Sequence, residues 1–157
     1  MAATEATARA FFSSPLFAVV GASSNPSKFG NKIFNWYHAH DLPVTPINPT
    51  ASTITLASRP EPFPALPSIS ALPSPTETAL SIVTPPAATL QVLRDAKRLG
   101  IRAVWLQPGS FNDEVLRVAR EEPAAFKAVV AGEGGVGREG WCVLVDGERA
   151  LKAVGKL

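Results

Sequence analysis

The chain has 157 residues, of which 46% are hydrophobic and 18% charged, and its formal net charge is +2. This length and composition are typical of one globular domain and exclude a disordered chain. The small, scattered charge excludes a nucleic-acid-binding surface, and no apolar run approaches the roughly 20 residues of a membrane span.

The first twenty residues predict a short helix followed by a strand. Thr4 to Phe12 is rich in alanine, and we expect Phe11 and Phe12 to pack against a sheet. Phe17 to Val20 is a short apolar, β-branched run, as in a buried strand. Gly21 ends it where a chain leaving a parallel sheet must turn sharply.

The segment after Gly21 predicts a phosphate-binding loop and a helix. Apolar residues recur at the spacing of one helical face, at Phe29, Ile33, Phe34 and Tyr37. The N-terminus of such a helix presents unpaired N–H groups and a partial positive charge to an anion. Ser23, Ser24 and Lys28 add two hydroxyls and a full charge. A tight turn that binds no ligand is the alternative.

The details of this loop disfavour an ordinary NAD site. A dinucleotide fingerprint has a second glycine where this chain has Ser23, and the next glycine after Gly21 is Gly30. The second strand, Val44 to Ile47, is followed by Asn48, whereas an acidic residue there would hold the ribose of NAD.

His38 and His40 lie near the end of the first crossover helix, which we expect to extend to about His40. Residues two apart do not share a helix face. We therefore expect no metal pair and interpret both side chains as solvent-exposed groups at the helix end.

Residues 51 to 78 predict an irregular crossover. Prolines at 60, 62, 64, 67, 73 and 75 forbid a helix and discourage a central strand. We expect a short strand at Ile54 to Leu56, a single turn at Ile69 to Leu72, and a surface crossover elsewhere. A proline-rich ligand for an aromatic groove is the alternative.

Regular order returns in the second half of the chain. Strands are expected at Ala79 to Thr84, Ala103 to Leu106 and Phe126 to Ala131. Pro86 suits the first turn of the intervening helix, Gly100 ends it, and Asn112 or Asp113 caps the next. Alternating strands and helices predict an α/β fold, with a doubly wound, mainly parallel sheet and helices on both faces.

Several groups of residues, in this order, carry a family resemblance. They are Val20-Gly21-Ala22-Ser23, the later Lys28 and Gly30, Ile47-Asn48-Pro49, Val83-Thr84-Pro85-Pro86 and Trp105-Leu106-Gln107-Pro108-Gly109. This pattern resembles the small single-domain CoA-binding proteins, which are similar to the N-terminal CoA-binding domain of the succinyl-CoA synthetase alpha subunit. The resemblance covers about residues 11 to 131. It implies a Rossmann-like domain that binds CoA at the carboxyl ends of its strands.

The resemblance also implies which residues bind the cofactor. The candidates are Gly21, Ala22, Ser23, Ser24, Lys28, Gly30, Asn48, Pro49, Thr50, Thr84, Pro85, Pro86, Gln107, Pro108 and Gly109. Backbone donors of the loop, the lysine and the two serine hydroxyls would hold the diphosphate. Asn48 would bind ribose or adenine, or else only end its strand. Thr84 to Pro86 would lie across the sheet from the first loop, and Gln107 would meet a pantetheine amide or satisfy nearby backbone.

The C-terminal part departs from the family pattern. Gly132 to Gly140 contains five glycines, and Trp141 to Val145 precedes an Asp146-Gly147 turn. Over residues 132 to 157 we therefore expect a flexible connection, a terminal strand and a turn, in preference to a second phosphate loop. The lone cysteine, Cys142, excludes an internal disulfide and a cysteine-rich zinc site. It resembles a cysteine that small CoA-binding proteins often carry, and it would form a mixed disulfide with CoA or be a buried structural residue.

No catalytic constellation is recognisable in the sequence, because it contains no nucleophile elbow and no metal-ligand cluster. We therefore predict one domain over 1–157 that binds CoA or an acyl-CoA, as a non-catalytic or regulatory module. The absence of signal-peptide character predicts a cytoplasmic location. A protein partner or a homodimer is left open. The alternatives are an NAD(P)-dependent oxidoreductase and an interaction protein that kept the fold but lost the ligand.

Overall fold

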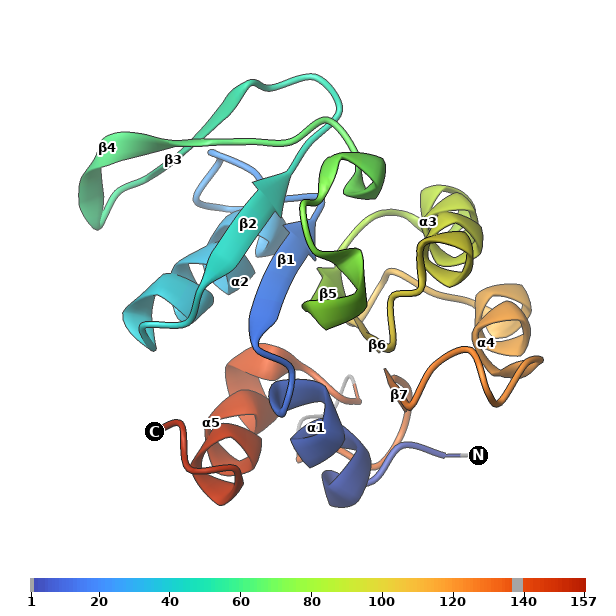
Figure 1. The fold of residues 1–157 in the computed structure, drawn as a ribbon. Helices are drawn as coiled ribbons and strands as arrows, with labels where there is room; N and C mark the ends of the chain where they lie inside the picture. Colours follow the sequence, from blue (N-terminus) through green and yellow to red (C-terminus); the bar gives the residue numbers. More distant parts are fainter. Residues whose placement is uncertain (1, 137–139) are drawn as a thin grey trace.

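Five parallel strands form the sheet on which the rest of the chain is built (Figure 1). The computed structural model describes residues 2–136 and 140–157. The elements in chain order are α1 (Glu5–Phe12), β1 (Leu16–Val20), α2 (Phe29–Ala39), β2 (Val44–Ile47), β3 (Thr53–Leu56), β4 (Arg59–Pro64), the 3-10 turns Ile69–Ala71 and Pro75–Glu77, β5 (Thr78–Ile82), α3 (Pro86–Leu99), β6 (Ala103–Leu106), α4 (Asp113–Arg120), β7 (Ala128–Val130) and α5 (Val143–Ala153).

The strand order is β2-β1-β5-β6-β7, and every neighbouring pair is parallel. Side chains of a strand alternate between the two faces, so each face has its own core. Helices α1, α2 and α5 pack on the face that carries Phe17 and Val19. Helices α3 and α4 pack on the face that carries Ala18 and Val20. The predicted doubly wound α/β sheet with helices on both faces is therefore confirmed.

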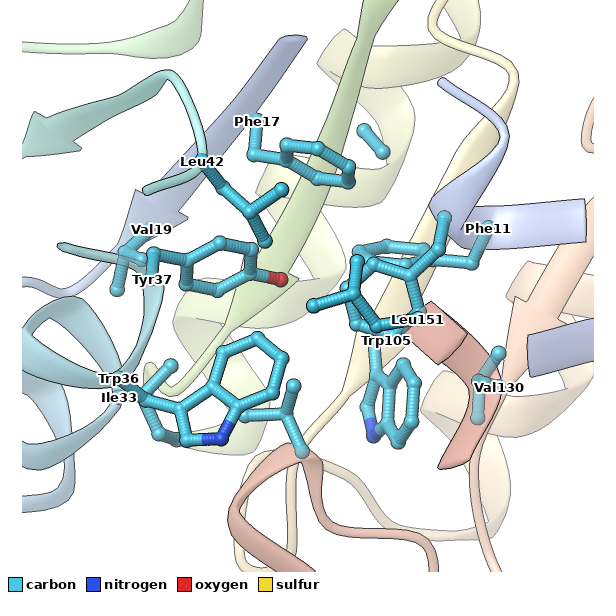
Figure 2. Close-up of a cluster of buried hydrophobic side chains, with 14 of the residues drawn as sticks. Phe11, Phe17, Val19, Ile33, Trp36, Tyr37, Leu42, Trp105, Val130 and Leu151 are labelled. Atoms are coloured by element: carbon cyan, nitrogen blue, oxygen red, sulfur yellow. The ribbon is translucent and has the colours of Figure 1, made fainter. Parts of the chain in front are cut away.

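Aromatic side chains fill the core beneath α1, α2 and α5 (Figure 2). Phe11 of α1 lies edge-on to Trp105, with ring centroids 5.5 Å apart, and Phe12 contacts Phe17 at 5.7 Å. These contacts confirm that the phenylalanines of α1 pack against the sheet. Tyr37 donates or accepts a 2.6 Å hydrogen bond with Ser81 Oγ, and burial raises the pKa of this tyrosine. The buried hydroxyl is thus satisfied inside the core.

The boundaries of most elements agree with the sequence patterns. Thr4 caps α1 through a reciprocal hydrogen-bonded capping box with Thr7. Gly100 ends α3 in the left-handed conformation, and the Asn112 side chain caps α4 by accepting from the Val115 backbone. The expected strand Ala79 to Thr84 runs instead from Thr78 to Ile82, and the last core strand is shorter than expected, at Ala128–Val130.

The proline-rich crossover contains a hairpin that the sequence indicated only in part. The short strand expected at Ile54 to Leu56 is confirmed as β3, but β4 pairs with it in antiparallel fashion and was not expected. Pro60, Pro62 and Pro64 lie in β4. Because β4 belongs to a two-stranded sheet, it pairs only with β3 in that sheet. Its prolines therefore do not remove backbone hydrogen bonds to a second neighbouring strand.

The prediction of a terminal strand and turn was wrong. Residues 143–153 form α5, and its Val143 and Leu151 are buried. The Asp146-Gly147 pair lies inside this helix, where a Cβ on Gly147 would be 2.5 Å from Trp36 Cζ2. Gly147 is therefore a position where α5 packs closely against α2. In the sequence, the Asp-Gly pair has the composition of a turn, so this role could not be recognised.

Candidate functional site

The sheet has its topological switch point between β1 and β5. From β1 the chain crosses to β2 on one side, whereas the later strands β5, β6 and β7 follow on the other. In an open α/β sheet, ligands bind outside the carboxyl ends of the strands at this point. The loop after β1 is therefore the first candidate for a binding site.

Gly21 lets this loop pass very close to β5. Its φ is +95°, a conformation that glycine adopts without strain. A Cβ at this position would lie 2.7 Å from Val83 Cγ2 and 3.3 Å from Thr84 Cγ2. The Gly21 turn and the Thr84 corner are thus direct neighbours. The expectation that Thr84 to Pro86 lies across the sheet from the first loop was wrong in this respect, because β1 and β5 are adjacent strands.

The start of the loop is bound to β2 through its backbone. The N–H groups of Gly21 and Ala22 both donate to the Ile47 carbonyl oxygen, at 3.0 and 3.2 Å. These two donors are therefore committed within the protein. Donors for a ligand must come from farther along, and the N–H groups of Phe29 and Gly30 at the start of α2 have no acceptor within the helix.

The serine-rich part of the loop is ordered by its own side chains. Ser23 Oγ accepts from the Asn25 backbone at 3.1 Å, and Asn25 Oδ1 accepts from the Ser27 backbone and hydroxyl at 3.0 and 2.7 Å. Ser24 Oγ accepts from the Thr55 backbone at 2.9 Å, which attaches the loop to β3. Ser23 and Ser24 act only as acceptors in these bonds, so each hydroxyl retains its hydrogen for a further acceptor.

Gly30 and Asn31 hold α2 tightly against this loop. A Cβ on Gly30 would collide with the Gly21 carbonyl oxygen and lie 3.2 Å from the Ser23 nitrogen. The Asn31 side chain donates from Nδ2 to the Ser23 carbonyl at 2.9 Å and to the Thr55 carbonyl at 3.3 Å. The β3–β4 hairpin and Asn31 are parts of this site that the sequence analysis missed.

A cation and an aromatic ring face solvent where α2 begins. Lys28 occupies the N-cap position and is exposed. Phe29 was expected on the buried face of α2 with Ile33, but 43% of it is exposed. The Lys32 ammonium lies 6.0 Å from the centroid of its ring. The expectation for Phe29 was wrong: Gly30 and Asn31 of the same helical turn are buried, whereas Phe29 is partly exposed to solvent.

Asn48 ties the first loop to the loop after β2. Its Nδ2 donates to the Ala22 carbonyl at 2.9 Å. Its Oδ1 accepts from the backbone and hydroxyl of Thr50 and from the backbone of Ala51, at 2.9, 3.1 and 2.9 Å. This carboxamide is therefore used within the protein, and the adjoining Pro49 is exposed. These hydrogen bonds make Asn48 a positioning residue for the loops after β1 and β2.

The corner after β5 lies beside Gly21 and is fixed by hydroxyl contacts. Thr84 Oγ1 lies 2.8 Å from Thr89 Oγ1, and the latter hydroxyl also approaches the Thr84 carbonyl at 3.1 Å. Pro85 is exposed, and Pro86 begins α3 as expected. This corner therefore forms a rigid wall on the β5 side of the switch point.

The turn after β6 divides into a buried and an exposed part. Gln107 is 1% exposed, and its Oε1 accepts from the Val143 backbone at 3.1 Å. Its Nε2 is buried and has no hydrogen-bond partner within the described part of the chain. Pro108 is half-buried, and Gly109 is exposed with a φ of +89°. Of the three residues, Pro108 and Gly109 face the sheet edge and Gln107 supports α5.

Cys142 lies at the N-terminus of α5, near the same edge. The residue is 8% exposed, and its backbone N–H donates to Asp146 Oδ2 at 3.0 Å. Asp146 is buried as well and accepts from the Val136 backbone at 2.8 Å. The glycine-rich segment and the start of α5 are thus held together by one carboxylate. Gly137 of that segment lies outside the described residues.

The two histidines lie at the opposite end of α2 from the loop. His40 Nδ1 donates to the Trp36 carbonyl at 2.7 Å, and His40 Nε2 lies 2.9 Å from Glu148 Oε1. Only 12% of its side chain is exposed. His38 packs against Phe34 and Phe63, with ring centroids 4.6 and 4.2 Å away. The interpretation of both as solvent-exposed groups was wrong, because α5 and the hairpin cover this end of α2.

Within the described residues, no group of three or more His, Cys, Asp or Glu side chains is placed to hold a metal ion. None of the described helices has the length and apolar character needed to cross a bilayer. The site therefore consists of an ordered loop, a helix N-terminus, hydroxyl donors and a lysine at a switch point. In a doubly wound α/β domain, these features make this edge of the sheet the candidate site for an anionic ligand.

The family model described as "CoA binding domain" matches residues 16–136. The match covers the sheet and every candidate site residue, and the chain belongs to this family of CoA-binding domains. The family therefore supports binding of CoA in general, and the resemblance recognised in the sequence is confirmed. No functionally curated protein matches the chain significantly.

Solved structures of uncharacterised proteins share the fold. A conserved hypothetical protein from Pyrococcus furiosus is 29% identical, with a TM-score of 0.61, over 73% of this chain and 90% of its own. A Thermus thermophilus protein is 26% identical, with a TM-score of 0.70, over 93% and 98% of the two chains. A hypothetical protein from Pyrococcus horikoshii is similar in fold alone, at 23% identity, a TM-score of 0.74, and 94% and 92% coverage.

Proposed function

We propose that the chain binds CoA or an acyl-CoA at the carboxyl edge between β1 and β5, and that it acts as a non-catalytic or regulatory module. The observation that carries this proposal is the ordered loop between Gly21 and Gly30, which ends in an exposed lysine at a helix N-terminus. The loop lies within the part of the chain that matches the family of CoA-binding domains.

The diphosphate of CoA is assigned to the end of this loop. Lys28 supplies a positive charge, and the N–H groups of Phe29 and Gly30 supply donors that have no helical acceptor. The hydroxyl hydrogens of Ser23 and Ser24 add two neutral donors. Because the loop is already held by internal hydrogen bonds, little conformational entropy is lost when an anion binds.

The adenine is assigned to the exposed ring of Phe29. A base that stacks on an aromatic side chain gains on the order of 1–3 kcal/mol, and this ring lies directly beside the proposed diphosphate site. Asn48 acts indirectly in this proposal, because its hydrogen bonds to Ala22, Thr50 and Ala51 hold the two loops in place.

The pantetheine arm is assigned to the edge formed by Thr84 to Pro86, Pro108 and Gly109. Two of these positions, Pro85 and Gly109, are exposed at the carboxyl ends of β5 and β6. Gln107 and Cys142 are both buried, so a direct contact with the arm requires local opening at the start of α5. A mixed disulfide between Cys142 and CoA is therefore an outcome for experiment to decide.

The proposal is tested by native mass spectrometry of the freshly purified protein, followed by calorimetric titration with CoA, acetyl-CoA, NAD and NADP. We expect saturable binding of CoA or acetyl-CoA and at least tenfold weaker binding of the two dinucleotides. A CoA adduct that is lost on reduction would identify a disulfide at Cys142. Binding of NADP in preference to CoA would replace the proposal with a dinucleotide enzyme. No binding of any of the four would favour an interaction protein.

A further inference from the structure

A cavity lies at the β7 end of the sheet, away from the proposed CoA site. It has a volume of about 300 Å³ and is lined by residues of α1, of the end of α4 and of β7. β7 is the terminal strand of the sheet opposite β2, and it lies between α1 and α4 (Figure 1). The first loop follows β1, which is three positions away from β7 in the strand order. The two places are therefore separate.

Arg120 is the unusual residue of this cavity. Its Nε is buried and has no hydrogen-bond partner within the described residues. The neighbouring carboxylates are occupied elsewhere, because Glu121 pairs with Lys97 and Arg117, at 3.3 and 3.0 Å. Glu122, which lines the cavity, also pairs with Lys97, at 3.3 Å. Within the described residues, no carboxylate forms an ion pair with the Arg120 guanidinium group that lines this cavity.

A buried guanidinium N–H without an acceptor is unfavourable, because it has lost water and gained no hydrogen bond. A carboxylate matches the fork of an arginine with two parallel hydrogen bonds. Lys127 adds a second cation to the lining, and its Nζ lies 3.4 Å from Ser13 Oγ, a long contact. The electrostatics of the cavity therefore favour a monoanion.

The rest of the lining provides an apolar wall and a hydroxyl donor. Phe126 and Val129 contribute apolar surface. The hydroxyls of Thr4 and Thr7 lie 3.1 Å apart, and each also accepts from the other residue's backbone N–H, at 3.2 and 3.3 Å. Because only one hydroxyl donates to the other, the second keeps its hydrogen for a ligand. The volume is at the small end of the range of about 300–1,000 Å³ for ligand sites.

From these features we propose that the cavity between α1, α4 and β7 binds a small organic carboxylate with an apolar body, held by Arg120. The carboxylate lies against the guanidinium group and the threonine hydroxyl. The apolar body lies against Phe126 and Val129. This binding site is additional to the proposed function, and neither depends on the other.

The first test titrates the wild-type protein with benzoate, with its neutral analogue benzamide and with inorganic phosphate. The readout is the Arg120 Nε–H signal, together with the backbone amide signals of the lining residues, in ¹H–¹⁵N NMR spectra. We expect saturable shifts with benzoate and at least tenfold weaker binding of the other two probes. Equal affinity for benzamide or phosphate, or no binding of benzoate, would overturn the proposal.

The second test compares two substitutions on the same helix. Arg120→Gln should weaken benzoate binding about tenfold to 100-fold, since it removes a charged hydrogen-bond donor. Arg117→Gln should leave the affinity unchanged, because Arg117 points to Glu121 and its side chain is 63% exposed. CoA titration should be the same in both variants. If Arg120→Gln does not fold, the comparison of benzoate with benzamide on the wild type still decides the question.

Discussion

The Cα of Gly30 faces the carbonyl oxygen of Gly21, and the two are so close that no Cβ fits between them. Gly30→Ala should therefore displace the first turn of α2 from the loop, although alanine is the better helix former. We expect a loss of stability of about 1–3 kcal/mol, as for overpacking of a rigid site, and weaker CoA binding. Urea unfolding and calorimetric titration measure the two effects.

Gly155→Ala is the matched control for this substitution. Gly155 has a φ of +77°, but a Cβ there meets no atom within 4 Å. The variant should lose on the order of 1 kcal/mol through backbone strain alone and bind CoA normally. If the two variants bound CoA equally well, close packing at Gly30 would not shape the site.

Asn48→Ala should lower both stability and CoA affinity. The substitution removes the donor to Ala22 and the acceptor shared by Thr50 and Ala51. We expect a loss of about 1–3 kcal/mol in the free energy of unfolding, as for unsatisfied partly buried groups. Asn48→Asp keeps the acceptor and loses only the donor, so its loss should be smaller. An alanine variant with wild-type stability would show that the carboxamide does not hold the loops.

Lys28→Ala tests the diphosphate assignment. Loss of a charged hydrogen bond should weaken CoA binding by about 1–3 kcal/mol, and the salt dependence of binding should decrease. Lys152→Ala removes the same charge from the exposed last turn of α5 and should leave CoA binding unchanged. Titrations at two salt concentrations make the comparison, and equal affinities of the two variants would show that the site is misplaced.

His38 makes stability depend on pH. Burial, and secondarily the nearby Arg59, lowers the pKa of His38 below its ordinary value of 6.5. The unfolded chain then binds the proton more readily than the folded protein. The stabilising effect is complete above pH 6.5 and decreases as the pH falls toward the lower folded-state pKa.

The substitution His38→Phe keeps an aromatic ring between Phe34 and Phe63 and removes the titrating group. Between pH 7.5 and pH 5, the variant should lose less stability than the wild type in urea unfolding. Equal losses for the two proteins would assign the acid sensitivity to other groups.

The sheet and the position of the binding edge could be predicted from local patterns. Short apolar runs that end at Gly21, Asn48 and Gln107 mark the carboxyl ends of strands, and parallel strands bring such ends to one edge. The contacts among these residues could not be predicted in the same way. The use of the Asn48 carboxamide by Ala22 depends on a residue 26 positions away, which no local pattern encodes.

The errors arise where tertiary contacts override a local signal. Phe29 has the spacing of a core residue, but it is 43% exposed at the start of α2. The prolines of β4 argue against a central strand and are acceptable in a two-stranded hairpin. Asp146-Gly147 has the composition of a turn, yet it lies in a helix because α5 must approach Trp36 closely.

The close contact between Gly147 and Trp36 predicts that Gly147→Ala lowers the stability of the protein, although the same substitution usually stabilises a helix. In an exposed helix, Gly→Ala stabilises by up to about 1 kcal/mol. In α5, a Cβ at Gly147 would lie 2.5 and 2.7 Å from two ring carbons of Trp36 and 2.9 Å from Val143 Cγ2. Gly147→Ala should therefore destabilise the protein by about 1–3 kcal/mol, because the rigid indole ring must move.

Val145→Ala, on the same helix but 52% exposed, should change stability by less than about 0.5 kcal/mol. Thermal and urea unfolding of both variants decide the point, and a stabilised Gly147→Ala protein would mean that α5 does not pack against α2 in this way.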